Sequence, residues 1–385
     1  MKKRPLRVLF LPTDEGGCGW YRIRQWDEFL SMRDDVESDL MDGKEQDPLE
    51  KLEWADVVVT RLSSTMYAKE IKMSVDCKKP IVFDHDDNTM EILPTSEHYK
   101  DFGTQDAYLK LENEVKPVWV TGHTEGFDMY RNLWGQMSLL YQLGAADMIT
   151  TPVPNLTKYF MEYAKNDCLG AVVPNCINFD MYPEGEFIPK NKKKGEIRLG
   201  WQGGVSHLGD WQEISPTLTR VLEDYPEVTM HIMGSFYKSQ FAGFKERITY
   251  YPWVPWKGFT YRLKTIGLDG AIIPLENAPF NEYKSEIKFT EFSQIGVPCL
   301  VKDMLPYSMV CKGGKNSYTY KTPEEFEIRL REMIEDLKSG GKKAKKYVKK
   351  ARKWVKNERN VEEWAGKLAK LYKNLLPSEV QEQLM

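Results

Sequence analysis

The sequence contains no apolar stretch approaching the roughly 20 residues that are needed to span a bilayer. Its opening segment, MKKRPLRVLFLPTDE, places basic residues before an apolar run, but that run is only about five residues long before Pro12. A secretory signal requires a longer apolar region. We therefore interpret this segment as a first strand and expect a soluble, cytoplasmic protein.

Closely spaced cysteine pairs of the kind that bind metals are also absent. The six cysteines stand in mostly apolar or turn contexts, which indicate free thiols in a reducing cytosol rather than a disulfide framework. Neither sign of charge predominates, because 54 Lys and Arg residues face 57 Asp and Glu residues, for a net charge of −3. Any affinity for nucleic acid or an anionic membrane must therefore come from local clusters.

Short apolar strands alternate with longer amphipathic segments in both halves of the chain. They include RVLFL, ADVVVT and KPIVFD in the first half, and IRLGW, VTMHIMG and GAIIPL in the second. Such strands, separated by helical lengths, indicate parallel sheets covered on both faces, the doubly wound arrangement of α/β proteins. A chain of 385 residues also exceeds the size at which a single core keeps growing, which favours two domains.

Composition also indicates where the domains begin and end. Residues 1–185 are predicted to form the first domain, and the polar, basic run EFIPKNKKKGE at 186–196 to form a linker. The second domain is predicted at 197–345. From Pro323 onward only helical patterns remain. We expect 346–385 to be C-terminal helices that pack back toward the N-terminal domain.

Open parallel sheets bind ligands beyond the carboxyl ends of their strands, so the loops that follow strands are the candidate sites. After the first strand, Gly16, Gly17 and Gly19 permit close backbone approach to an anion, or simply tight packing. After KPIVFD comes Asp-His-Asp-Asp at residues 84–87. Because neighbouring strand residues point to opposite faces, we expect polar roles in a cleft for one or two of them rather than a metal site. A solvated turn or helix cap is the alternative.

The second half repeats this logic in the stretch IRLGWQGGVSHLGDW, which places Gly203, Gly204, Ser206, His207 and Asp210 after a strand. Gly203 and Gly204, followed by Ser206 and His207, can offer amides and donors to a phosphate. The alternative is a turn with a helix N-cap.

A later stretch, KSEIKFTEFSQIGVP, places two lysines and a glutamate at helical spacing. Steps of four and three put Lys284, Lys288 and Glu291 on one stripe of a predicted helix. Two positive charges suit a diphosphate, and a carboxylate can accept two hydrogen bonds from a ribose diol. A solvated face with Lys and Glu pairs is the alternative. The segments PFN before and IGVP after look buried, which favours a site.

Asp269 to Pro298 resembles the donor-site segment of GT-B glycosyltransferases related to the retaining GT4 group. In that family a carboxylate precedes a small-residue helix that ends in Gly-x-Pro, matched here by Glu291, Gly296 and Pro298. Further similar segments, in the family's order, are EGGCGWYRI, AADMITTPVPNLTKYF, VVPNCINFDMY and GWQGGVSHLGD. The Gly-Cys-Gly turn followed by an aromatic residue and Arg resembles above all the glycosyltransferases of tailed bacteriophages. The GT4 pattern has a second acidic residue eight positions before the glutamate, where this chain has Tyr283 beside Glu282.

The resemblance implies an α/β protein of the GT-B fold, with two doubly wound Rossmann-like domains facing a cleft and C-terminal helices. The N-terminal domain would hold the acceptor and the second domain the donor, most simply a UDP-sugar, with retention of configuration. No metal and no cofactor beyond the nucleotide sugar are implied, because basic residues and helix dipoles stabilise the leaving diphosphate. A phage-encoded enzyme would work in the host cytoplasm.

The resemblance implies that Glu291 binds the donor ribose and that the Gly203–Gly204 pair contacts the phosphates. It also implies that the diphosphate and the sugar are bound by Lys284, Ser285 and Lys288. The predicted catalytic residues are Glu291, Lys288, Lys284 and His85. The predicted donor-binding residues are Gly17, Gly19, Gly203, Gly204, His207, Trp253, Val254, Lys284, Ser285, Lys288 and Glu291, with Trp253 and Val254 beside the base. The predicted acceptor-side residues are Tyr21, Arg22, Asp84, Asp86 and His123.

The acceptor stays open between a saccharide or cell-envelope glycan and a modified base in phage DNA. Residues 338–356 carry ten Lys and Arg in nineteen positions, with Ala344, Val348, Ala351 and Val355 as a predicted apolar seam. We expect this segment to be a packed helix whose basic surface is simply solvated. The alternative is that the basic surface binds a polyanion, either nucleic acid or an anionic membrane. A non-catalytic nucleotide-sugar or polyanion-binding protein of the same fold is the alternative function.

Overall fold

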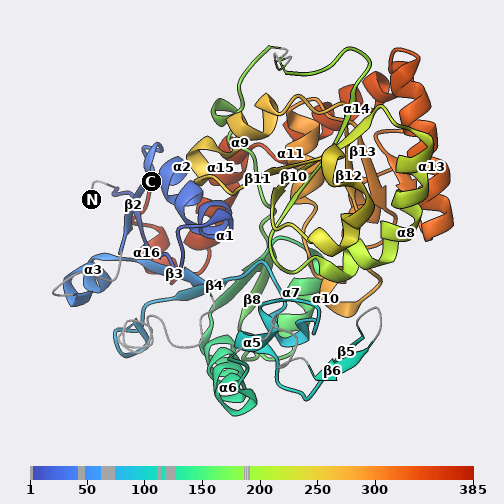
Figure 1. Ribbon diagram of the computed structural model, residues 1–385. Helices are drawn as coiled ribbons and strands as arrows, with labels where there is room; N and C mark the ends of the chain where they lie inside the picture. Colours follow the sequence, from blue (N-terminus) through green and yellow to red (C-terminus); the bar gives the residue numbers. More distant parts are fainter. Residues whose placement is uncertain are drawn as a thin grey trace.

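The computed structural model describes residues 3–41, 48–61, 74–110, 114–117, 126–185, 187, 189 and 191–385. The predicted acceptor-side residue His123 lies outside these residues, as do three positions of the predicted linker. Two lobes, each built on a parallel sheet, face one another (Figure 1).

Six parallel strands form the N-terminal sheet, in the order β2-β1-β3-β4-β7-β8. In chain order they are β1 (Leu6–Leu11), β2 (Val36–Leu40), β3 (Val57–Arg61), β4 (Ile81–Asp84), β7 (Met148–Thr151) and β8 (Leu169–Val172). The main helices are α2 (Gln25–Ser31), α3 (Pro48–Trp54), α6 (Met129–Ala145) and α7 (Pro154–Met161). A short antiparallel pair, β5 (Tyr108–Lys110) and β6 (Val115–Pro117), stands apart from the sheet.

Alternation along β1 explains how helices cover both faces of this sheet. Val8 and Phe10 share one buried cluster with α2, whereas Leu9 and Leu11 share another with α3, α6 and α7. A strand that is apolar on both faces therefore sits at the centre of a three-layer domain.

The second sheet is also parallel, in the order β11-β10-β9-β12-β13-β14. Its strands are β9 (Ile197–Gly203), β10 (Val228–Gly234), β11 (Ile248–Tyr251), β12 (Gly270–Ile273), β13 (Cys299–Lys302) and β14 (Tyr318–Tyr320). Helices α8 (Leu208–Asp224) and α13 (Pro323–Lys338) pack on one face. The other face is covered by α9 (Trp256–Thr265), α11 (Ile287–Gln294) and α12 (Tyr307–Val310). The short α10 (Pro279–Glu282) precedes α11 in the chain.

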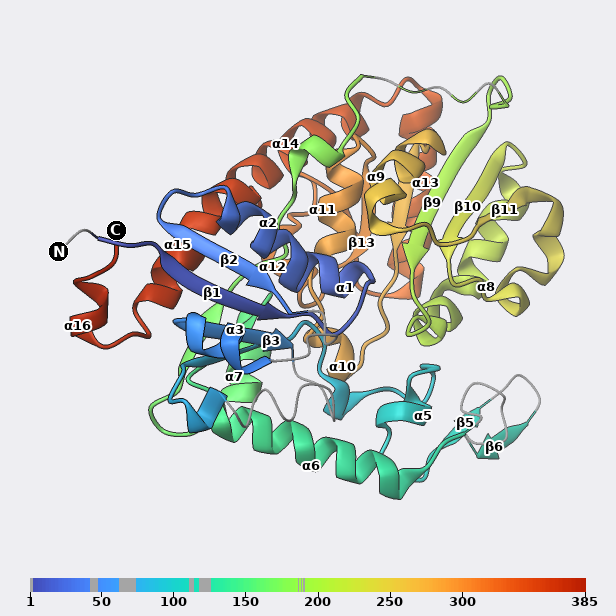
Figure 2. The ribbon, with the colours of Figure 1, turned by 90° about the vertical axis from the view of Figure 1, so that its left-hand side faces the viewer.

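The last helices connect the two domains. Helix α14 (Lys342–Glu358) packs on α11 and α13, whereas α15 (Val361–Lys373) packs on α2 and joins the core beneath β1. Helix α16 (Ser378–Gln381) follows, and Leu384 forms a bridge with Arg4, which places the two chain ends side by side (Figure 2). The return to the N-terminal domain therefore begins at α15, and the predicted boundary at 345/346 falls inside α14.

Helix α14 has the predicted apolar seam and basic surface. Ala344, Ala351 and Val355 are buried, but Tyr347 is the fourth buried residue where Val348 was predicted. No described helix combines the length and the apolar character needed to cross a membrane.

Candidate active site

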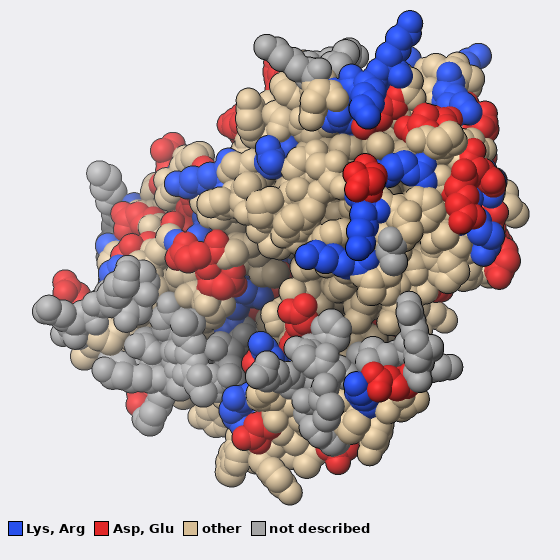
Figure 3. Space-filling model, viewed as in Figure 1, with Lys and Arg blue, Asp and Glu red and all other residues tan. Residues whose placement is uncertain are grey.

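A cavity of about 850 Å³ lies between the carboxyl ends of the two sheets. Its walls come from the loops after β1, β4 and β9 and from the segment of α10 and α11. The space-filling view is hollowed at this place, with Lys or Arg side chains inside the hollow (Figure 3). This is the volume of a ligand site, and the carboxyl ends of parallel strands are where such sites form.

Glu291 lines the cavity from α11 and is 3% exposed. Tyr21 in the N-terminal domain donates its hydroxyl to Oε1 at 2.8 Å, and Gln202 at the end of β9 donates its amide to Oε2 at 2.7 Å. Burial raises the pKa of this carboxyl to about 7, although the Tyr21 hydrogen bond and Lys288 act in the opposite direction. Glu291 is therefore held on both oxygens by groups from two domains and is poised to change charge near neutrality.

Lys288 lies one turn before Glu291 on α11 and belongs to a buried chain of polar groups. Its ammonium is 2.9 Å from His207 Nε2, and His207 Nδ1 is 2.5 Å from Asp210 Oδ2. Asp210 Oδ1 accepts from the Glu276 amide at 2.7 Å. Burial, together with the charges of Lys288 and Lys284, lowers the pKa of His207, so its ring is neutral and can accept from Lys288. The chain fixes the position of an ammonium that faces the cavity.

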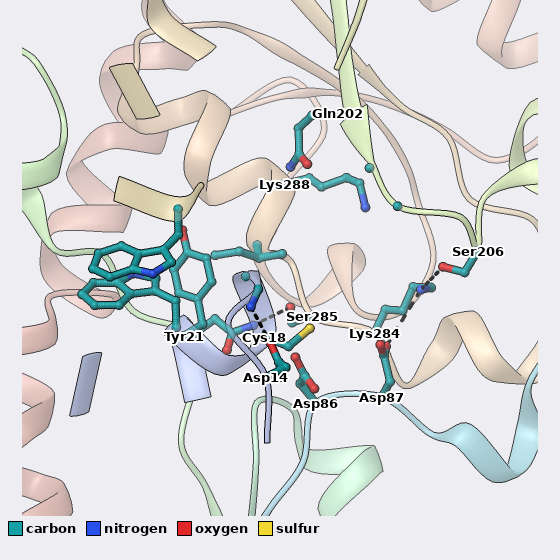
Figure 4. Close-up of a pocket in the computed structure, with 18 of the residues that line it drawn as sticks. Asp14, Cys18, Tyr21, Asp86, Asp87, Gln202, Ser206, Lys284, Ser285 and Lys288 are labelled. Carbon is teal, nitrogen blue, oxygen red and sulfur yellow. Dashed lines mark hydrogen bonds and ion pairs between the residues drawn. The ribbon is translucent and has the colours of Figure 1, made fainter. Parts of the chain in front are cut away.

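Lys284 lies near Lys288 but not on the same helix, which corrects the prediction of a single stripe. Helix α10 ends at Glu282, and Glu286 is the N-cap of α11, so Lys284 stands in the turn between them. Its ammonium donates to Ser206 Oγ at 3.3 Å and lies 3.9 Å from Asp87 Oδ1 (Figure 4). The turn still points this charge into the cavity, where burial and Lys284 both lower the pKa of Lys288.

Ser285, in the same turn, is held from the N-terminal domain. Its hydroxyl accepts from Asn175 Nδ2 at 2.9 Å, and Asn175 Oδ1 in turn accepts from Arg22 at 2.9 Å. Both Ser285 and Asn175 line the cavity.

The glycines have different roles. Gly17, Gly203 and Gly204, which were predicted to bind the donor, line the cavity, and a Cβ at Gly203 would come within 2.5 Å of the Trp201 ring. Gly19 is buried instead, where a Cβ would meet the Asp14 carbonyl oxygen at 2.1 Å. Gly19 therefore serves packing of the first turn rather than contact with a ligand.

One end of the cavity is aromatic. Trp253 and Val254, predicted beside a base, both line it, and Trp253 is 49% exposed. Trp20, after β1, stacks on Trp256 of α9 with ring centroids 3.6 Å apart and planes 12° apart. This stack joins the two domains at the cavity wall.

Arg22 and Asp84, two predicted acceptor-side residues, lie behind the cavity. Both are buried, and the guanidinium donates to both carboxylate oxygens, at 2.7 and 2.6 Å. Thr150 also donates to Asp84 Oδ2 at 2.6 Å. These groups satisfy one another, so their role is to fix the ends of β4 and β7 against the first turn. Tyr21, predicted with them, does line the cavity.

Asp86 lines the cavity and is paired with a cation that the sequence analysis did not select. Arg61, the last residue of β3, donates to Asp86 Oδ1 at 2.7 Å and also binds Asp14. Burial acts to raise the pKa of Asp86, but Arg61 and the other neighbouring groups together outweigh it and hold the pKa below the ordinary range. Among the described residues, no three His, Cys, Asp or Glu side chains are grouped to share a metal ion.

His85 lines the cavity from the end of β4 and is 6% exposed. Neither ring nitrogen has a hydrogen-bond partner among the described groups, although the backbone amide donates to the Thr150 carbonyl at 3.0 Å. Burial, with the nearby Arg61 charge, lowers the pKa of His85 to about 4. The site therefore holds a neutral imidazole with unused hydrogen-bonding capacity.

Several residues of the site were not predicted. Gln202, Asn175 and Arg61 are polar groups that bind predicted residues from the ends of strands or from the segment that follows one. Gln202 and Arg61 both stand at the carboxyl end of a strand, and that position is the signal by which they could have been selected. Tyr283, at the family's acidic position, packs on Tyr159 at 5.1 Å between ring centroids and is not part of the cavity wall.

No protein-family model matches the chain, and no curated protein sequence does. Solved structures nevertheless match almost its whole length. HepE from Anabaena, in complex with UDP and glucose, superposes with a TM-score of 0.61 at 12% identity, over 96% of this chain and 100% of that one. The fold is GT-B.

Two further GT-B structures agree. Sucrose-phosphate synthase from Thermosynechococcus elongatus gives a TM-score of 0.59 at 13% identity, covering 96% of this chain and 99% of its own. A glycosyltransferase from Rickettsia africae gives 0.60 at 11% identity, covering 97% and 99%. The prediction of two doubly wound domains facing a cleft is therefore confirmed. At these identities the likeness establishes the fold, and the activity has to be argued from the site.

Proposed function

We propose that this protein is a glycosyltransferase that moves a sugar from a nucleoside diphosphate sugar, most simply a UDP-sugar, to an acceptor hydroxyl. The observation that carries the proposal is the pair of cations, Lys284 and Lys288, that line one cavity together with Glu291. A diphosphate can accept hydrogen bonds from both ammonium groups and balance their charge, and a ribose diol supplies two donors for the carboxylate. The HepE structure, of the same fold, contains UDP and glucose.

The donor would lie along the second domain. Its base would meet Trp253 and Val254, its ribose Glu291, and its phosphates the lysines and the Gly203–Gly204 turn. The bond between the sugar C1 and the β-phosphate oxygen breaks, the acceptor oxygen forms the new bond to C1, and the acceptor proton leaves with the nucleoside diphosphate. Lys284 and Lys288 stabilise the charge that develops on that phosphate, so the proposed reaction needs no metal ion or other cofactor.

His85 would bind a hydroxyl of the transferred sugar or of the acceptor. A buried neutral imidazole whose two nitrogens have no partner in the described part of the chain can donate to one oxygen and accept from another. Asp86 and Tyr21 complete this side of the proposed site, whereas Arg22 and Asp84 support it from behind.

A saccharide, such as a cell-envelope glycan, is the acceptor that suits the cavity best, because the cavity wall includes no residue of the basic segment 338–356. A modified base in DNA is the second candidate, favoured by the exposed lysines of α14. We also propose retention of configuration, on the resemblance of residues 269–298 to the donor segment of retaining enzymes. The anomeric proton coupling in the NMR spectrum of the product tests that point.

Transfer is tested by incubating the protein with UDP-sugars and a panel of saccharide acceptors, and by measuring both UDP release and product mass. The proposal predicts acceptor-dependent UDP release that is lost in His85→Ala and Lys288→Ala. Saturable UDP-sugar binding without any release above hydrolysis by water would instead support the non-catalytic alternative.

A further inference from the structure

Helix α6 exposes a continuous apolar stripe on the outside of the N-terminal domain. Tyr130, Trp134, Met137 and Tyr141 are 73%, 71%, 58% and 69% exposed, and Leu133 extends one edge. Steps of four, three and four place the first four side chains on one face of the helix. In Figure 2 the helix runs along the lower edge of the domain. Large apolar side chains gathered in this way mark a contact surface, whereas scattered ones do not.

The opposite face of α6 holds the helix against the N-terminal domain. Leu139 and Leu143 enter the core, and the buried Asn132 amide donates to the carbonyls of Lys100 and Gly103, both at 2.9 Å. The N-cap Asp128 accepts from the Arg131 amide at 3.0 Å. The exposed stripe is therefore not needed to hold the helix in place, which is consistent with a role in binding a partner.

The stripe is large for a monomer. Since a Tyr or Trp side chain carries roughly 150–250 Å² of surface, the five side chains expose on the order of 600 Å². A standard interface buries about 800 Å² on each partner. The stripe can thus supply most of one specific interface.

The order of residues in the stripe points to the partner. Tyr130 and Tyr141 are equally far from the midpoint of the stripe, between positions 135 and 136, and so are Trp134 and Met137. A second copy of α6 lying antiparallel would place Tyr130 against Tyr141 and Trp134 against Met137, twice. The second pair is a favourable contact between a thioether and an aromatic ring. A self-complementary patch of this kind is what an interface with two-fold symmetry requires.

Charge around the stripe argues against a membrane surface. Arg131 is the single charged residue of Met129–Ala145, and its guanidinium donates to the carbonyls of Lys100 and Gly126 at 3.1 and 3.3 Å. Binding to an anionic bilayer relies on several Lys or Arg residues beside the apolar face. We propose that two copies of this chain associate through α6, as an antiparallel pair about a two-fold axis.

The association leaves the cavity open. None of the five stripe residues belongs to the cavity wall, which α6 meets only through Leu139 on its inner face. Nucleotide binding and association can therefore be measured independently, and this inference does not rest on the proposed function.

Sedimentation velocity over a range of concentrations tests the proposal on three proteins. We expect a dimer for the wild type, and a dissociation constant at least tenfold higher for Trp134→Glu/Met137→Glu. Tyr261→Glu is the matched control, because Tyr261 on α9 is 62% exposed and lies outside the stripe. Unchanged circular dichroism and an unchanged midpoint of thermal unfolding would show that the double variant is folded. A wild type that is monomeric at every concentration, or a double variant that stays dimeric, would overturn the proposal.

Cross-linking tests the register. Copies carrying Tyr130→Cys mixed with copies carrying Tyr141→Cys should form a disulfide, beyond any background from the native cysteines of the parent protein. Tyr130→Cys alone should not, since eleven residues of helix separate the two equivalent positions by about 16 Å. A cross-link of Tyr130→Cys with itself would contradict the antiparallel arrangement. Stripe-dependent binding of a monomer to vesicles of phosphatidylserine and phosphatidylcholine would assign the stripe to a membrane and overturn the dimer.

Discussion

The hydroxyl of Tyr21 donates to Glu291 Oε1 over 2.8 Å, from the helical segment Trp20–Arg24 of one domain to helix α11 of the other. Gln202 holds the second oxygen at 2.7 Å, so the carboxylate is the point at which both domains and the end of β9 meet. The proposed ribose site is thus also a contact between the domains, and changes at Glu291 should affect both ligand binding and stability.

Glu291→Gln should weaken UDP binding about tenfold at pH 8 without loss of fold. The amide keeps the shape of the side chain but replaces a charge-assisted acceptor, worth roughly 1.5–3 kcal/mol, by a neutral one worth about 1 kcal/mol. Isothermal titration calorimetry measures the change, with Glu363→Gln on the exposed surface of α15 as a control. Equal affinities in the two variants would remove Glu291 from the donor site.

The pKa of Glu291 predicts a pH dependence of stability. The folded value is about 7 and the ordinary value 4.5, so the folded state binds this proton more tightly than the unfolded state. The resulting stabilisation is complete below about pH 4.5 and is lost as pH rises through 7, by up to ~3 kcal/mol. Glu291→Gln lacks this loss. Urea unfolding at pH 5 and pH 8.5 should therefore show that the free energy of unfolding of the variant rises relative to that of the wild type at the higher pH. The same difference in free energy at both pH values would contradict the assignment.

Lys288→Ala should weaken UDP binding more than His207→Ala does. The first removes the ammonium, whereas the second removes only the ring that positions it at 2.9 Å. Lys345→Ala, an exposed lysine of α14, is the control for loss of one positive charge. If binding of uridine, which has the base and ribose of UDP but no phosphate, were weakened as strongly as binding of UDP by Lys288→Ala, the lysine would not be acting on the diphosphate.

Transfer should proceed in the presence of EDTA. The two lysines supply positive charge to the leaving group, while Arg22 and Arg61 occupy Asp84 and Asp86. Initial rates with EDTA, magnesium and manganese check this expectation. Activity that EDTA abolishes and either ion restores would mean that a metal carries part of that charge.

The basic face of α14 decides between the acceptors. If DNA is the acceptor, neutralising the exposed residues Lys345, Lys346, Lys349 and Lys350 should flatten the salt dependence of duplex binding. Each lost phosphate contact removes about 0.9 from the log–log slope. Transfer to a saccharide should be unchanged by the same substitutions. Wild-type protein with no salt-dependent affinity for duplex DNA would exclude the DNA acceptor.

The alternating apolar strands predicted the fold because buried parallel strands leave a strong local signal. Lys288 and Glu291 were predictable as neighbours because α11 is a helix, and a step of three keeps them on one face. The same reasoning failed for Lys284, because α11 begins only after its N-cap residue Glu286 and Lys284 therefore precedes the helix.

Pairing across the chain was not predictable from local pattern. Arg22 and Asp84 are 62 residues apart in sequence, and only the order of strands brings them into a buried ion pair rather than the cavity. Gln202 is a single neutral amide without any repeating pattern, although it holds the central carboxylate. Both cases depend on tertiary contacts that periodicity does not record.

Calorimetric titration of UDP into the wild type and Lys288→Ala tests the central claim most directly, because it measures whether the cavity binds a nucleoside diphosphate through its lysines. The account predicts one UDP per chain for the wild type and an affinity at least tenfold lower for the variant. Absence of binding by UDP and by the ADP, GDP, CDP and dTDP counterparts, or equal affinities in the two proteins, would contradict it.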